Sequence, residues 1–129
     1  MRLLLDTHVF LWWLGDDRRL GARLRSEIGA PRTEVLVSAA SVWEIAIKVA
    51  LGRLAIDGVD VSRGDGLIQD AGFRELPVSA RHAAAVAVLP LLHSDPFDRL
   101  LIAQARAENA TLVSKDPVLA RYDVTILSR

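Results

Sequence analysis

Carboxylates are the side chains whose positions in this sequence first suggest chemistry. Asp6 ends a short apolar run, Leu3–Leu5, and Asp116 follows the apolar pair Leu112–Val113 within three residues. Short, continuously apolar runs are typical of strands that are covered on both faces of a parallel sheet. We therefore expect Asp6 and Asp116 at the carboxyl ends of two buried strands.

Two further acids lie on helices that the same sequence predicts. Glu44 lies one to two turns into a helix over Ala39–Leu51, which follows a strand at Val35–Val37. Asp98 lies in the first turn of a helix that opens at Asp95. In an open parallel sheet, ligands bind outside the carboxyl ends of the strands, where the strand order reverses. The four acids are therefore expected to face one edge of the molecule.

Such a group of acids has a definite chemistry. Carboxylates that lie close together raise one another's pKa unless a cation neutralises them. Mg²⁺ and Mn²⁺ prefer oxygen ligands, and a bound metal ion both activates water and stabilises charge on a phosphoryl group. Zinc is a poor alternative, because the chain has no cysteine and only 3 histidines. The pattern predicts a phosphodiesterase site that uses Mg²⁺ or Mn²⁺.

Each acid also has a purely structural explanation. Asp6 can cap the helix after the first strand. Asp95 and Asp98 can stabilise the positive end of their helix. Asp116, which precedes Pro117, can simply be a residue of a turn. Only the expected common location of these acids distinguishes a site from separate caps and turns.

Glu44 has a different structural alternative, an ion pair with Lys48 four residues later. The rest of that helix is apolar almost all round, so Ser41, Glu44 and Lys48 form its only polar stripe. A solvated ion pair and a functional stripe both explain this pattern.

The remaining segments predict the elements that must hold these acids. Further strands are expected at Phe73–Leu76 and Val124–Leu127, and further helices at Val9–Leu14, Gly21–Gly29 and Ser79–Val88, while the helix that opens at Asp95 should run to Asn109. The segment Leu54–Gly72 is expected to be mostly loop with one helix before Gly72, as indicated by Asp57, Gly58, Asp60, Ser62, Gly64 and Asp65. Strands that alternate with helices predict an α/β fold of three layers, α/β/α, with a mainly parallel sheet.

Composition bounds the function classes. A chain of 129 residues, 51% hydrophobic and 25% charged, fits one globular domain over residues 1–129. The net charge is +0, so the whole molecule has no cationic field for nucleic acid, although an arginine-rich surface can be basic locally. The apolar start is too short for a signal peptide, and Pro90 interrupts the longest other apolar stretch, Ala83–Leu92. We therefore expect a cytoplasmic protein with no membrane association.

With these residues in view, the whole chain resembles PIN-domain ribonucleases of the VapC toxin type. Leu4–His8 is similar to the first motif of that family and Ser38–Ile45 to the second. His93–Ala103 resembles the family's most distinctive block, and Leu112–Asp116 its fourth motif. The third block is highly specific, whereas the first and fourth are weak when taken alone.

The resemblance implies a role for each acid. Asp6 and Asp98 would hold the catalytic metal, Mg²⁺ or Mn²⁺, directly. Asp116 would join them as a metal-site acid, partly through water, and Glu44 would complete the acidic pocket as a catalytic residue. A metal-activated water would then hydrolyse an RNA phosphodiester bond and leave a 5′-phosphate and a 3′-hydroxyl. The hydroxyls of Thr7 and Ser114 would orient these carboxylates, whereas capping alone explains Asp95 adequately.

The resemblance also implies partners. A PIN-domain toxin binds an antitoxin, VapB-like or similar, whose basic tail enters the acidic pocket, and such toxins are usually homodimers. The apolar helices around Trp12–Trp13 and Trp43–Ile47 are candidate contact surfaces, although core burial also explains most of these residues.

Two alternatives stay open from the sequence. The chain can be a PIN fold that only binds and does not cleave, although the presence of all four acids argues weakly against this. It can also be a metal-independent ribonuclease that uses His8 and His93, which would remain active in EDTA.

Overall fold

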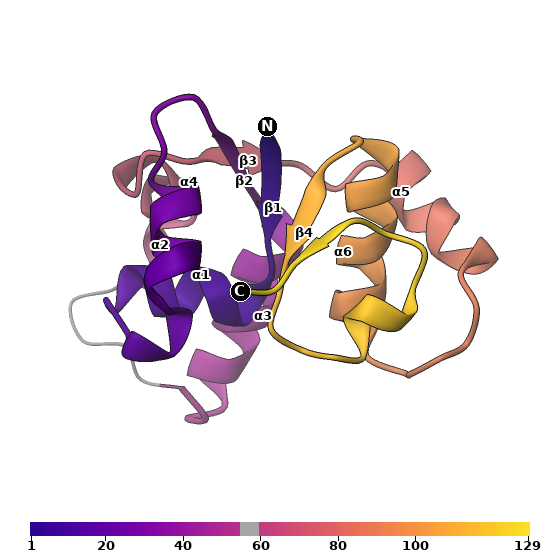
Figure 1. The fold of residues 1–129 in the computed structure, drawn as a ribbon. Coiled ribbons are helices and arrows are strands. Elements are labelled where there is room, and N and C mark those ends of the chain that lie inside the picture. The colour runs from indigo at the N-terminus through magenta and orange to yellow at the C-terminus, as the bar shows by residue number, and fades with distance from the viewer. Residues whose placement is uncertain (55–59) are drawn as a thin grey trace.

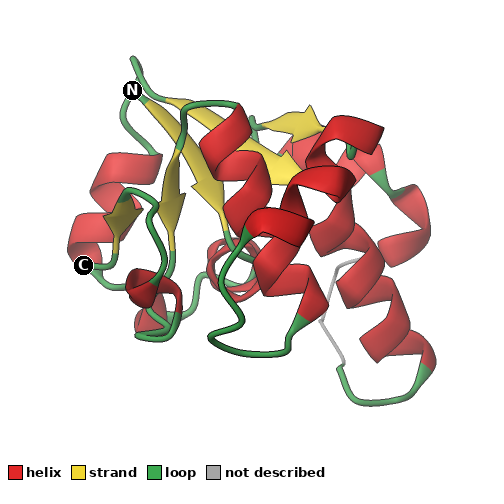
Figure 2. Ribbon diagram, turned by 90° about the vertical axis from the view of Figure 1, so that its right-hand side faces the viewer, coloured by secondary structure: helices red, strands yellow, loops and turns green. Residues whose placement is uncertain are grey.

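Residues 1–54 and 60–129 are described by a computed structural model of the chain. A sheet of 5 strands forms its centre, in the order β3-β2-β1-β4-β5, and every pair of neighbouring strands is parallel. The strands are β1 (Arg2–Leu5), β2 (Glu34–Ser38), β3 (Arg74–Leu76), β4 (Thr111–Val113) and β5 (Ile126–Leu127). Figure 2 shows these strands side by side beneath the helices.

Both faces of the sheet are covered because successive side chains of a strand point to opposite faces. In β1, Leu3 and Leu5 join one hydrophobic cluster, while Leu4 joins a second cluster on the other face. Helices α1 (Thr7–Leu14), α2 (Ala22–Ile28) and α4 (Asp65–Asp70) contribute to the first cluster, and α6 (Pro96–Ala107) contributes to the second. Figure 1 shows α1, α2 and α4 on one side of the sheet and α5 (Ala80–Ala85) with α6 on the other. The predicted three-layer α/β/α fold is confirmed.

Local signals in the sequence set the ends of several helices. The Ser38 side chain accepts a hydrogen bond from the Ala40 N–H at the start of α3 (Ala39–Ala50). At the other end of α3, Gly52 has a φ of 69° and its N–H donates to Val49 O. This left-handed conformation favours glycine, so Gly52 is well suited to end the helix.

The structure differs from the sequence predictions mainly at the ends of elements. The first helix begins at Thr7 rather than Val9, because the Asp6 carboxylate accepts from the Val9 N–H and so starts the helix earlier. The helix expected over Ser79–Val88 ends at Ala85 and continues as a 3₁₀ turn over Val86–Val88.

Other boundaries shift at the end of the chain and in the middle segment. The helix expected to reach Asn109 ends at Ala107, and only Ile126–Leu127 of the last predicted strand pairs with β4. The expected helix before Gly72 is present as α4, preceded by a 3₁₀ turn at Val61–Arg63. Asp57 and Gly58, on which part of the loop prediction rested, lie outside the described residues.

In the described part of the chain, no helix combines the length and the apolar character needed to cross a membrane.

Candidate functional site

The direction in which the chain adds strands reverses beside β1. The chain passes from β1 to β2 and β3 on one side, and then returns to place β4 and β5 on the other. The crevice at such a reversal, outside the carboxyl ends of the strands, is where open α/β sheets bind ligands. Asp6 is the first residue after β1 and Ser114 the first after β4, and the Asp6 N–H donates to Val113 O at 3.0 Å. The topology therefore aims the loop that carries Asp116 at the same crevice as Asp6.

Asp6 is both a helix cap and a buried acid. Its Oδ1 accepts from the Val9 N–H at 2.8 Å, yet only 5% of the residue is exposed. Burial raises the pKa of Asp6, and the negative charge of Asp116 raises it further. The hydroxyl of Ser114 and the Val9 N–H oppose this rise by stabilising the carboxylate. The capping explanation is thus correct for Asp6, but it does not account for a buried acid that lies near a second one.

Asp98 is the most perturbed acid of the site. Burial raises its pKa to about 6, and the charges of Asp95 and Asp6 add to the rise. The hydrogen bond from His93 acts in the opposite direction, with His93 Nε2 at 3.2 Å from Asp98 Oδ2. Asp98 therefore interacts electrostatically with Asp6, as Asp6 does with Asp116. The fold therefore brings Asp6 within electrostatic reach of two acids that are far from it in the sequence, Asp98 and Asp116.

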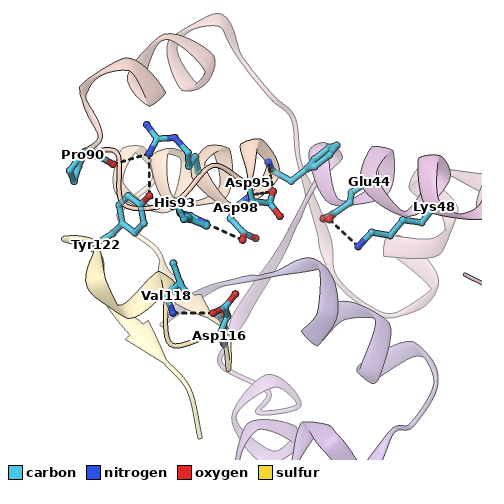
Figure 3. A network of polar contacts seen from close by, with 12 residues as sticks. Glu44, Lys48, Pro90, His93, Asp95, Asp98, Asp116, Val118 and Tyr122 are labelled. Atoms are coloured by element: carbon cyan, nitrogen blue, oxygen red, sulfur yellow. Dashed lines mark hydrogen bonds and ion pairs between the residues drawn. The ribbon is translucent and has the colours of Figure 1, made fainter. Parts of the chain in front are cut away.

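Asp95 and Asp116 both have local backbone roles as well. Asp95 Oδ1 accepts from the Phe97 and Asp98 N–H groups at 2.9 and 3.2 Å, so Asp95 caps α6. Asp116 Oδ1 accepts from the Val118 N–H at 3.0 Å, which shapes the turn after β4 (Figure 3). Unlike Asp95, Asp116 leaves its second oxygen without a hydrogen bond to the described residues and contributes to the pKa of Asp6.

Glu44 approaches the site from α3 but carries its own counter-ion. Its Oε2 lies 3.1 Å from Lys48 Nζ, and the residue is only 7% exposed. Trp43 and Phe97, which directly precede Glu44 and Asp98, meet edge to face with ring centroids 5.2 Å apart. Helices α3 and α6 therefore pack together next to these two acids, as Figure 3 shows. The predicted pair with Lys48 is present: the Glu44 side chain is nearly buried, whereas that of Lys48 is 34% exposed.

The two hydroxyls predicted to support the acids are placed differently. Ser114 contacts Asp6, and its Oγ also accepts from the Asp116 N–H at 3.1 Å, so it links the two acids. The Thr7 hydroxyl instead donates to Ser41 Oγ at 3.1 Å, which joins α1 to α3. Thr7 therefore supports the packing between two helices that carry the site rather than a carboxylate.

Sequence reasoning did not assign a structural role to three residues that adjoin the acids. His93 bonds to Asp98 and to the hydroxyl of Tyr122, and Tyr122 in turn bonds to the nearly buried Arg99. His93 and Arg99 lie in the block that resembles the PIN family, which was the available signal. Nothing in the pattern around Tyr122 indicates that this residue, far along the chain, reaches the site.

Oxygen donors make this group of acids suitable for a hard divalent cation. Carboxylates that repel one another favour a cation that neutralises their charge. Within residues 1–54 and 60–129, however, no three His, Cys, Asp or Glu side chains are drawn together as a ready-made set of ligands. The acids therefore fit an ion such as Mg²⁺, which keeps several waters and takes one or two carboxylates, better than an ion that needs a complete protein cage.

Comparisons with solved structures agree with this architecture. The structure of VapBC2 from Rickettsia felis bound to a promoter DNA fragment matches with a TM-score of 0.69 and 18% identity, over 98% of each chain. The structure of FitAB bound to an IR36 DNA fragment matches with a TM-score of 0.66 and 25% identity, over 97% of this chain and 93% of that one. FitAcB from Neisseria gonorrhoeae matches with a TM-score of 0.55 and 21% identity, over 97% of this chain and 96% of that one.

Sequence comparison leads to the family itself. No curated protein sequence matches the chain. The PIN-domain family model matches residues 3–124, from β1 to the residues just before β5. Because this match covers nearly the whole chain and all four predicted acids, the chain belongs to the PIN-domain family.

Proposed function

We propose that this protein is a Mg²⁺- or Mn²⁺-dependent endoribonuclease and the toxin component of a VapC-type toxin–antitoxin pair. PIN domains are nucleases. The observation that supports the proposal most strongly is the electrostatic coupling of Asp6, Asp98 and Asp116 at the reversal of strand order.

Each acid has its own role in the proposed reaction. Asp6 and Asp98 would hold the cation, and Asp116 would complete the acids around it. When bound, Mg²⁺ or Mn²⁺ supplies an activated water and stabilises negative charge on the phosphoryl group. Glu44 would complete the group of acids from α3, and Lys48 partly balances its charge and holds its carboxylate in place. The buried positions of Asp6 and Glu44 limit the water around the site and so strengthen these interactions.

The proposed partner is a VapB-like antitoxin with a basic segment. A tail rich in arginine or lysine complements the negative charge of the acids. The solved structures of VapBC2 and FitAB, which the fold of this chain resembles, support a partner of this kind. Of the two surfaces predicted from sequence, Trp12 and Trp13 are partly buried against the core, whereas Trp43 is 63% exposed. Trp43 is therefore the better candidate for an apolar contact with the antitoxin or with a second copy of the chain.

The histidine mechanism is less well supported. Both ring nitrogens of His93 already make hydrogen bonds, to Tyr122 and to Asp98, so neither is free to act as a base on RNA. His8 is exposed and its ring lies 6.3 Å from that of Trp12. A PIN fold that only binds is distinguished from a nuclease by activity alone.

Cleavage of a structured RNA by the purified protein tests the proposal. We expect cleavage with Mg²⁺ or Mn²⁺, loss of cleavage in EDTA, and strong loss in Asp6→Asn, which keeps the shape of the side chain and removes its charge. Asp123→Asn is the matched control, because Asp123 is exposed and lies with Arg106 and Asn109 near the end of α6 opposite to Asp98. Undiminished cleavage in EDTA would favour the histidine mechanism, and no cleavage with either metal would favour a binding module.

Expression in cells provides a second test of the same proposal. The wild-type chain should arrest growth, and Asp6→Asn should abolish the arrest while Asp123→Asn retains it. Equal toxicity of the Asp6→Asn protein at equal expression would contradict the assignment.

A further inference from the structure

A continuous chain of hydrogen bonds connects a nearly buried arginine to the site acid Asp98. Arg99 Nη1 donates to the Tyr122 hydroxyl at 3.1 Å, the Tyr122 hydroxyl lies 2.7 Å from His93 Nδ1, and His93 Nε2 lies 3.2 Å from Asp98 Oδ2. Figure 3 shows Tyr122, His93 and Asp98 in succession along α6. We call these residues, Arg99, Tyr122, His93 and Asp98, the Arg–Tyr–His–Asp chain.

The donor and acceptor of each hydrogen bond in this chain follow from its two ends, Arg99 and Asp98. An arginine side chain has only donors, so Arg99 can only donate to the Tyr122 oxygen. The buried Tyr122 hydroxyl needs an acceptor for its own proton, and of its two partners among the described residues only His93 Nδ1 can accept. A neutral imidazole that accepts at Nδ1 carries its proton on Nε2, and that proton points to Asp98. The opposite direction would place the Nε2 lone pair against the negative Asp98 carboxylate.

Packing holds this chain rigidly. Arg99 is only 7% exposed, and its Nη1 also donates to Pro90 O at 2.8 Å. Its Nη2 donates to the Val86 and Leu89 carbonyls, both at 3.4 Å. Tyr122 is buried, and its ring meets that of His93 at 5.4 Å in an edge-to-face arrangement. The imidazole therefore has a defined position as well as a defined proton.

We infer that His93 is a positioning residue for the nuclease reaction: held by Tyr122 and Arg99, it donates its Nε2 proton to Asp98 Oδ2 and orients that carboxylate for the metal ion. This inference rests on the proposed function of the acids. A carboxylate with one oxygen fixed by a donor keeps its other oxygen available in a constant orientation. Partners of this kind around metal ligands typically change metal affinity or activity about 10- to 100-fold when they are removed.

The position of the proton is measured first, on the metal-free wild-type protein. Nitrogen NMR of the imidazole distinguishes a protonated ring nitrogen from an unprotonated one. In the pH range where the ring carries a single proton, we expect that proton on Nε2, and a larger share of the form protonated at Nδ1 in Tyr122→Phe, which removes only the hydroxyl. A wild-type His93 that carries its proton on Nδ1 would overturn the inference whatever the enzyme does with RNA.

Mn²⁺ affinity of the intact protein, measured by calorimetric titration, tests the effect on the site. We expect His93→Ala to weaken Mn²⁺ binding about tenfold. His93→Gln should recover part of the loss, because its amide still donates to Asp98. Tyr122→Phe should weaken binding less than His93→Ala, and adding it to His93→Ala should cause no further loss, since Tyr122 acts through His93. Additive losses would overturn the inference, because independent structural effects add.

A control separates this effect from a general loss of stability. His82, which is buried, is also bonded to a carboxylate, with Nε2 3.0 Å from Glu108 Oε2, and it lies outside the site. We expect His82→Gln to leave Mn²⁺ affinity unchanged; an equal loss would show that the His93 effect is not specific. A wild-type protein that binds Mn²⁺ in the His93-dependent way but cleaves no RNA would contradict the proposed function and support this inference.

Discussion

Replacing Asp98 by asparagine removes one negative charge from the group of acids and keeps the shape of the side chain. The same change distinguishes a metal ligand from an acid that only stabilises the first turn of α6. Asparagine still offers an oxygen to the Nε2 proton of His93, so the hydrogen bond between these residues is retained.

The expected size of the effect follows from the pKa of Asp98. A rise from 3.8 to about 6 makes the ionised native protein less stable by roughly 3 kcal/mol, at about 1.36 kcal/mol per pKa unit. The side chain is 22% exposed, and solvent screening reduces the expected cost to about 1–2 kcal/mol. Asp98→Asn removes this cost and so gains stability. It also loses the favourable negative charge at the start of α6, which reduces that gain by about 0.3–1 kcal/mol. Without metal, Asp98→Asn should therefore be more stable than the wild type by about 1 kcal/mol at neutral pH.

The sign of the pH dependence is also determined. Because the pKa is higher in the folded protein, the stabilisation that protonated Asp98 provides is fully present below the ordinary pKa of 3.8 and is lost as the pH rises through about 6. The advantage of Asp98→Asn should therefore be greatest above about pH 6 and should disappear below about pH 4.

Thermal melts at several pH values, with and without Mn²⁺, measure both effects. Mn²⁺ at about 100 times its Kd should stabilise the wild type by about 2.7 kcal/mol and the variant by clearly less. Asp123→Asn is again the control for loss of one exposed charge. The reasoning is refuted if Asp98→Asn melts below the wild type at neutral pH without metal and gains as much stability from Mn²⁺.

The other predictions concern the caps, the core, the ion pairs and the exposed surface. Asp95→Ala should lower the free energy of unfolding by about 1 kcal/mol in a denaturant titration, because it removes a helix cap, while the stabilisation by Mn²⁺ is retained. Ile102→Ala should cost about 2–5 kcal/mol in the same titration, because Ile102 is fully buried. The hydrogen bond from His82 lowers the pKa of Glu108 from 4.5, so Glu108→Gln should reduce stability at neutral pH, and melts should show that this difference vanishes in acid. Trp43→Ser should cost no more than about 1.5 kcal/mol of stability, because Trp43 is exposed apart from its contact with Phe97, but it should weaken co-purification with the antitoxin at about 1 M salt, where exposed charge pairs are strongly screened.

Local patterns in the sequence determined most of the elements. The run Leu3–Leu5 predicts a strand buried on both faces, and the structure divides its side chains between two hydrophobic clusters. Asp6 and Asp95 were recognisable as caps, because a side-chain oxygen of this kind binds nearby N–H groups whatever the rest of the fold does. The exact ends of α5 and α6 were less predictable, since neighbouring backbone conformations at a helix end differ little in energy.

The sequence also placed Asp6 and Asp116 after strands, but it did not say which strands are neighbours. Only the tertiary structure pairs β1 with β4 and so makes the two acids interact. The pairing depends on long-range packing and chain crossover, which leave no signal in local periodicity.

The surroundings of the acids were decided by tertiary structure alone. Tyr122 is 29 residues from His93, yet the two side chains share a hydrogen bond, and Arg99 is nearly buried although arginine is usually exposed. A charged or polar side chain can be buried only where the fold supplies its partners, and those partners come from distant segments. For this reason the sequence identified the candidate acids, while only the folded chain shows which side chains bond to them and why the pKa values of Asp6 and Asp98 are raised.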